Sequence, residues 1–124
     1  MTLHVSFVVP AYNEEALLPR ATRLGDGLRG RLEAVRPFVP QIAEVRGLGA
    51  MLAIEFQVPE TGAAAPDFAR RVQQLAMAQG LLLLTCGVYG NVIRFLMPLT
   101  TPDDVFAEGL DILERALRTA ADRS

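Results

Sequence analysis

The sequence contains no lysine, because all 12 of its basic residues are arginine. A guanidinium stays protonated and is not a nucleophile, so the chain cannot supply a side-chain amine that forms a Schiff base. The only cysteine, Cys86, excludes an intramolecular disulfide and fits a reducing compartment such as the cytoplasm. The only histidine, His4, lacks the companions that a zinc site needs, so we expect no metal site.

Strong charge and long apolar runs are also missing. A net charge of −2 and a pI near 5.3 do not point to nucleic acid or an anionic membrane as a partner. The apolar stretch at residues 5–9 is too short for a signal peptide or a membrane span. With 51% hydrophobic and 21% charged residues, the chain is expected to form one globular domain over residues 1–124.

Apolar patterning predicts five strands and three helices in the order β-α-β-β-α-β-β-α. Apolar residues spaced three or four apart predict a helix that carries Leu24 to Val35, another from about Pro66 to Gly80, and a last helix with a stripe from Phe106 to Leu117. Short runs rich in apolar and β-branched residues predict strands at 5–9, 42–46, 50–56, 81–85 and 92–97. We therefore predict an α+β two-layer sandwich, with one mostly antiparallel sheet, residues 81–85 as a central strand, and helices on one face.

Local signals refine the helix ends. Pro19 suits the first turn of the first helix better than its interior. Three glycines at positions 25, 27 and 30 weaken that helix, each by up to about 1 kcal/mol relative to alanine. Thr101 is predicted to cap the last helix, with Pro102 as its first residue.

Two long blocks carry a resemblance. Residues 44–55 read EVRGLGAMLAIE, and residues 80–100 read GLLLLTCGVYGNVIRFLMPLT. Together they resemble the C-terminal small domain of class III aminotransferases, close to the 4-aminobutyrate type, over about residues 24–124. Enzymes of that family hold pyridoxal phosphate as a Schiff base on a lysine. The resemblance implies that Arg94 matches the arginine that binds the α-carboxylate of the substrate in a bidentate fork.

The same resemblance defines what this chain is expected to lack. The family's lysine, its carboxylate partner of the pyridine nitrogen and its phosphate-binding loops belong to a large domain, which we expect to be missing here. We therefore predict no catalytic residue, no cofactor-binding residue and no transamination by this chain alone. The implied partners are further copies of the chain or a separate large-domain polypeptide.

A second, shorter resemblance concerns the N-terminus. Residues 5–15, VSFVVPAYNEE, are similar to the opening of family 2 glycosyltransferases, which touch a sugar nucleotide there. The rest of that fold and its Asp-x-Asp motif are absent. We therefore divide the chain into a glycosyltransferase-like segment, residues 1–20, and an aminotransferase-like domain, residues 24–124, with a join between two genes near Pro19 to Leu24.

Simpler interpretations stand beside these. Without the resemblance, Arg94 is a solvent-face arginine of a strand, Cys86 is a small buried hydrophobe, and the acids Glu14 and Glu15 stabilise a helix N-terminus.

Three functions remain open. The first is an orphaned aminotransferase small domain, and the second is a module that binds a small carboxylate, an amino acid or a protein. The third is a remnant that binds a sugar nucleotide.

Overall fold

The computed structural model describes residues 14–96 and 98–123 of the chain, including the side chains of residues 19–95 and 98–123. The strand predicted at residues 5–9 lies outside this part. The described residues form a four-stranded sheet, three α-helices and one short 3-10 helix, η1. In chain order they are α2 (Glu14–Val35), η1 (Arg36–Phe38), β1 (Ile42–Leu48), β2 (Met51–Phe56), α3 (Pro66–Ala78), β3 (Leu84–Cys86), β4 (Val92–Leu96) and α4 (Asp103–Asp122).

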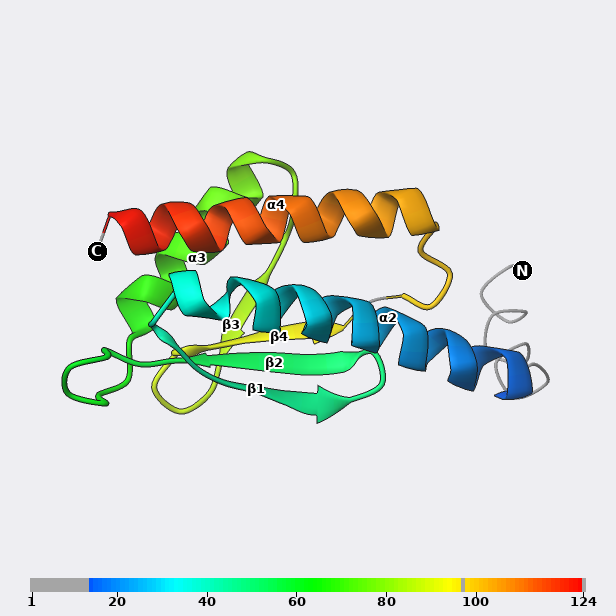
Figure 1. The fold of residues 1–124 in the computed structure, drawn as a ribbon, viewed down its shortest axis with the longest axis horizontal. Coiled ribbons are helices and arrows are strands. Elements are labelled where there is room, and N and C mark those ends of the chain that lie inside the picture. The colour runs from blue at the N-terminus through cyan, green and yellow to red at the C-terminus, as the bar shows by residue number, and fades with distance from the viewer. Residues whose placement is uncertain (1–13, 97, 124) are drawn as a thin grey trace.

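The sheet has the strand order β1-β2-β4-β3, and every neighbouring pair is antiparallel. The three helices pack on the same side of this sheet, so that Figure 1 shows a layer of helices above a layer of strands. The predicted α+β two-layer sandwich is confirmed. We call the side of the sheet that faces the helices the covered face, and the opposite side the open face.

The core fills the space between the covered face and the helices. Strand β2 contributes Leu52, Ile54 and Phe56, every second residue, and all three are buried. This alternation is what a strand with one buried face requires. The predicted helical stripes face the core as well: α2 contributes Leu24, Leu28, Leu32 and Val35, and α4 contributes Leu110, Leu113 and Leu117. Phe106, the first residue of the α4 stripe, is only partly buried.

Close approach between α2 and the sheet depends on Gly25. A Cβ atom at this position would overlap the carbonyl oxygen of Gly49, in the turn between β1 and β2. Gly30, which lies in the same helix, has no atom within 4 Å of the place where its Cβ would be. The glycine at position 25 therefore weakens the helix locally and at the same time allows α2 to pack on the turn.

The prediction of a central strand at residues 81–85 is wrong. Strand β3 comprises only Leu84–Cys86, and it lies at the edge of the sheet beside β4. Leu83 is buried, whereas Leu82 is 79% exposed and Leu84 is 73% exposed. An apolar run looks the same in a sequence whether a second layer covers it or not, and here no described element covers the outer side of β3.

The two predictions about helix ends are also wrong. Helix α2 already begins at Glu14, so that Pro19 lies inside it, even though proline has no N–H to donate. Helix α4 begins at Asp103 with Pro102 as its N-cap, and the carbonyl of Pro102 accepts a hydrogen bond from the amide of Phe106. The hydroxyl of Thr101 donates instead to the carbonyl of Pro98, at 2.7 Å, so it tightens the preceding turn rather than capping the helix.

Arg20 connects the start of α4 to α2. Its guanidinium donates to the carbonyl oxygens of Leu99 and Thr101 and forms an ion pair with Asp103. The hydrogen bond and the charge of Arg20 lower the pKa of the Asp103 carboxyl. These contacts fix the turn that leads from β4 into α4, and this turn forms one wall of the cavity described below.

Candidate functional site

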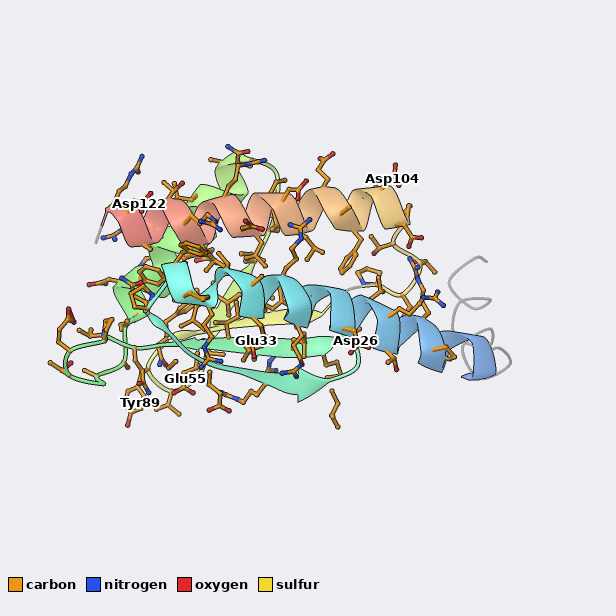
Figure 2. All side chains as sticks on the ribbon, viewed as in Figure 1. Asp26, Glu33, Glu55, Tyr89, Asp104 and Asp122 are labelled. Carbon is orange, nitrogen blue, oxygen red and sulfur yellow. The ribbon has the colours of Figure 1, made fainter. Side chains whose placement is uncertain are left out.

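The open face brings together residues from all four strands. Because side chains alternate along a strand and the register is antiparallel, the outward positions can be assigned from the pairing. They are Glu44, Arg46 and Leu48 on β1, Met51, Ala53 and Glu55 on β2, Leu84 and Cys86 on β3, and Val92 and Arg94 on β4. Figure 2 shows Glu55 and Tyr89 on the side of the sheet away from the helices.

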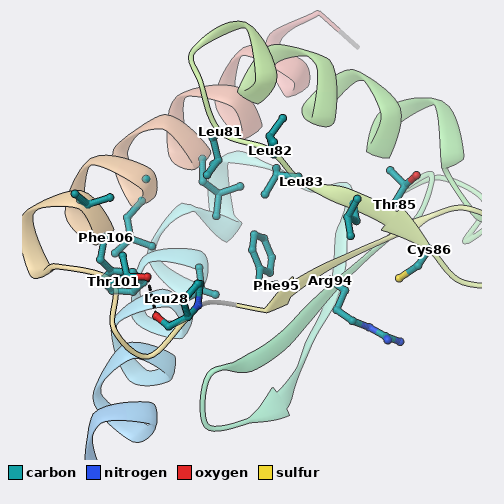
Figure 3. Close-up of a pocket in the computed structure, with 16 residues that line it drawn as sticks. Leu28, Leu81, Leu82, Leu83, Thr85, Cys86, Arg94, Phe95, Thr101 and Phe106 are labelled. Carbon is teal, nitrogen blue, oxygen red and sulfur yellow. Dashed lines mark hydrogen bonds between the residues drawn. The ribbon is translucent and has the colours of Figure 1, made fainter. Parts of the chain in front are cut away.

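Arg94 stands on the open face, with no charged partner in the part of the chain that the structure describes. Its direct neighbours across the sheet are Ala53 on β2 and Leu84 on β3. The side chain is exposed, and Figure 3 shows it extending away from the leucines and Phe95. Within the described residues it forms no ion pair and no hydrogen bond through its side chain. An unpaired guanidinium beside a small residue such as Ala53 has room to bind a carboxylate in a bidentate fork.

Arg46 is the useful contrast, because it lies on the same face and is also a neighbour of Ala53. Its guanidinium forms an ion pair with Glu55 at 2.8 Å and lies 3.9 Å from Glu44. The two acidic residues of the open face, Glu44 and Glu55, thus both lie close to Arg46 at the β1–β2 end of the sheet. At the β4 end the positive charge of Arg94 is available to an anion from outside.

A cavity of about 630 Å³ lies next to Arg94, between α4, β4 and the segment that leads into β3. Its inner walls are leucine and phenylalanine side chains, among them Leu28, Leu81, Leu83, Phe95, Phe106 and Leu113. Leu84, Cys86 and Arg94 also line it (Figure 3). Residues 81–83, which line it, do not continue the pairing of β3 with β4.

Of the other candidate residues in the sequence, only Cys86 has a described side chain. Cys86 ends β3 and is partly exposed, so the prediction that it is buried is wrong. Tyr89 is exposed in the turn between β3 and β4. The side chains of His4, Glu14 and Glu15 lie outside the described part of the chain.

The described part of the chain offers neither a cluster of metal ligands nor a helix suited to crossing a membrane. There, no group of three or more His, Cys, Asp or Glu side chains is placed to hold a metal ion. No helix in residues 14–96 or 98–123 is both long and apolar enough to cross a membrane.

Comparison with known families decides the ancestry. Residues 5–117 match the model of the family "Aminotransferase class-III". The chain belongs to this family. The matched range includes residues 5–20, for which we considered a glycosyltransferase origin, and no finding supports that second resemblance.

Curated relatives of this class III aminotransferase chain act on ω-amino acids, according to their names. The chain is 41% identical over 116 residues to the 5-aminovalerate aminotransferase DavT of Pseudomonas putida, which covers 92% of this chain and 27% of that protein. It is 38% identical over 114 residues to the 4-aminobutyrate aminotransferase GabT of Escherichia coli, covering 91% of this chain and 27% of that protein. The chain thus spans about a quarter of the length of the relatives it matches.

Solved structures show the same relationship. The N-acetylornithine aminotransferase of Stenotrophomonas maltophilia superposes with a TM-score of 0.71 at 28% identity, over 88% of this chain and 28% of that one. The ornithine aminotransferase of Toxoplasma gondii superposes with a TM-score of 0.74 at 25% identity, over 90% of this chain and 25% of that one. The sandwich described here is therefore a part of the class III aminotransferase fold.

Class III aminotransferases use pyridoxal phosphate, and the residues of this chain do not fit that cofactor. The family's Schiff base needs a lysine, and none of the 124 residues is a lysine. Arginine cannot replace it, because its guanidinium remains protonated. The sequence pointed to Arg94 through its motif. It gave no direct sign of the cavity, although four consecutive leucines at residues 81–84 exceed what a three-residue edge strand uses.

Proposed function

We propose that these 124 residues act as the carboxylate-binding small domain of a 4-aminobutyrate-type aminotransferase, and that they do not catalyse transamination by themselves. The observation that carries this proposal is Arg94, an exposed guanidinium on the open face with no ion pair among the described residues. The lack of lysine supports the second half, because the Schiff base has to come from elsewhere. We also propose that residues 1–124 form a single domain.

In this proposal Arg94 binds and orients the carboxylate of an ω-amino acid. A bidentate fork fixes both the position and the rotation of a carboxylate, and such orientation lowers the entropic part of a reaction barrier. The names of the relatives support 4-aminobutyrate and 5-aminovalerate as substrates, and we propose the former. In this proposal the pyridoxal phosphate and its lysine are supplied by a large domain outside these 124 residues.

The open face is the surface proposed to meet that large domain. Apolar side chains stand exposed on it, since Leu48, Met51 and Leu84 are 88%, 62% and 73% exposed. An apolar patch of this kind is typical of an interaction surface. Without a large domain, the same patch is expected to bring two copies of the chain together. We place this assembly in the cytoplasm, where the single Cys86 stays reduced.

A chimera tests the proposal. Residues 24–124 replace the matching C-terminal quarter of the Escherichia coli 4-aminobutyrate aminotransferase, and turnover is compared with that of the 124-residue chain alone. We expect turnover from the chimera and none from the chain. In the chimera, Arg94→Gln should raise the KM for 4-aminobutyrate by about 100-fold, as expected when a charged hydrogen-bond partner is removed from a binding site.

Arg46→Gln is the matched control, because Arg46 lies on the same face but is paired with Glu55. It should leave KM and kcat of the chimera unchanged. Cofactor absorbance of each chimera verifies that its cofactor site is intact. Turnover by the 124-residue chain, or an unchanged KM in the Arg94→Gln chimera, would overturn the proposal.

A second candidate function rests on the same exposed guanidinium. The chain alone could bind a small carboxylate or an amino acid at Arg94, without any large domain. Titration with 4-aminobutyrate, glutamate and 2-oxoglutarate, followed by backbone amide shifts, distinguishes this function. Saturable shifts around Arg94 and Ala53 support it, and their absence removes it.

A further inference from the structure

The cavity beside Arg94 has the character of a ligand site rather than of a packing defect. Its inner wall includes Leu28, Phe95 and Leu113, which are all buried, and these side chains come from α2, β4 and α4. Its volume of about 630 Å³ falls in the range of small-molecule sites. Water gains little in an apolar cavity, because it finds few hydrogen-bond partners there, whereas an apolar ligand gains contacts.

The cavity is lined from both sides of the sheet at its β3 edge. Leu83 and Phe95 contribute from the covered face, and Leu84 and Arg94 from the open face. Ladder pairing of β3 with β4 runs only from Leu84 opposite Arg94 to Cys86 opposite Val92, so residues 81–83 lie beyond it. Because one cavity is lined by residues of both faces, a ligand in it can contact the leucines and Arg94 at the same time.

Charge selects the head group of that ligand. Arg94 is the one charged residue among the described residues that line the cavity. The hydroxyl of Thr101, another polar group in the lining, already donates to the carbonyl of Pro98. A ligand with one negative end and one apolar end satisfies Arg94 and fills the leucine wall. A dicarboxylate or an amino acid would place a second charge among apolar side chains, at a large desolvation cost.

We propose that this cavity binds the alkyl chain of an unbranched aliphatic monocarboxylate, of about 8–12 carbons, whose carboxylate contacts Arg94. The site shares Arg94 with the proposed function. It depends on the leucine cavity and needs no large domain, so the two ideas fail separately. The ligand is a free carboxylic acid in solution, and a second copy of the chain that covers the cavity is the alternative that the test exposes.

The test uses the 124-residue chain and decanoate, below the concentration at which decanoate forms micelles. Calorimetric titration should show saturable 1:1 binding. Decan-1-ol, which has the same chain and no charge, should bind at least 10-fold more weakly, and butyrate should show no binding. From hexanoate to octanoate to decanoate, affinity should rise by up to about fourfold per added methylene, since each buried methylene adds its own transfer free energy.

Gly109 offers a way to fill the cavity. It lines the cavity from the middle of α4, and a Cβ atom there would lie 3.9 Å from the Cδ1 atom of Leu81, an ordinary contact. Gly109→Leu should weaken decanoate binding at least 10-fold while α4 stays folded, because leucine is a far better helix former than glycine. Gly30→Leu is the matched control, since Gly30 lies in α2 with open space around it, and it should leave binding unchanged.

Arg94→Gln should weaken the binding of decanoate about 10-fold and leave the binding of decan-1-ol unchanged, whereas Arg46→Gln should change neither affinity. Methyl shifts of Leu81 and Leu113 report occupancy of the cavity directly, so the test does not depend on any variant folding well. The proposal is overturned by the absence of saturable binding, by equal affinities for the acid and the alcohol, or by Gly109→Leu binding as the unmodified chain does. Light scattering that shows dimers unable to bind decanoate would also overturn it, in favour of a second copy over the cavity.

Discussion

The covered and open faces of the same sheet show what a layer of helices changes. Along β2, Leu52, Ile54 and Phe56 point toward the helices and are buried, while Met51, on the other face, is 62% exposed. The backbone ladder is common to both faces, so the difference comes from what covers each of them. Burial of apolar surface is the main stabilising term in folding, and the covered face supplies most of it here.

The two ends of the open face differ in whether their arginine is paired with an acid. At the β1–β2 end, Arg46 forms an ion pair with Glu55, so its charge is already compensated by a residue of the same sheet. At the β4–β3 end, Arg94 has no described partner, and Leu84 is exposed beside the cavity. Buried apolar surface is therefore concentrated on one face, and the proposed carboxylate-binding residue lies at one end of the other.

The largest expected contrast between the faces comes from shortening one side chain on each. Phe56 is fully buried and its ring packs against that of Phe68, with centroids 5.1 Å apart. Phe56→Ala should lower the free energy of unfolding by about 3–5 kcal/mol, through lost burial and a remaining cavity. Met51→Ala, on the open face, should change it by less than about 0.5 kcal/mol.

Urea unfolding of both variants, at low micromolar concentration, measures the two values. The low concentration matters, because association of two copies would bury Met51 and raise its contribution. Equal losses for the two variants under these conditions would contradict the assignment of a covered and an open face.

The second contrast concerns the contact between α2 and the sheet, and it predicts opposite signs for one chemical change. Gly30→Ala should stabilise the chain by up to about 1 kcal/mol, because alanine is the better helix former and the position is open. Gly25→Ala should destabilise it by about 1–3 kcal/mol, because the new Cβ overlaps the carbonyl oxygen of Gly49 and the helix has to move away. Thermal unfolding followed by circular dichroism measures both, and a stabilising Gly25→Ala would show that the helix does not pack on that turn.

Much of this fold follows from the sequence. The stripe from Leu24 to Val35 and the alternation in β2 each identify a buried side without any knowledge of the partner. The class III resemblance then identified Arg94, and the exposed position of that residue follows from its place between the buried Ile93 and Phe95.

Other features depend on contacts between distant residues, so local rules missed them. The apolar run at residues 81–85 indicated a buried strand, but only the pairing of β4 shows that it forms an edge. Thr101 has the chemistry of a helix cap and donates instead to Pro98. The cavity is formed by four separate elements, and no short stretch of sequence can show that their side chains leave a space.

The smallest contrast separates the two arginines that flank Ala53. The ion pair between Arg46 and Glu55 is partly exposed, so a double-mutant cycle should give a coupling of about 0.2–1 kcal/mol, which shrinks as salt is added. The same cycle between Arg94 and Glu55 should give a coupling within error of zero. Arg94→Gln alone should leave the free energy of unfolding within about 0.5 kcal/mol of the original, since no described carboxylate loses a partner. A clear loss of stability in Arg94→Gln would mean that this arginine already has an anionic partner within the chain. Both arginines of the open face would then be paired, and neither would be available to an external carboxylate.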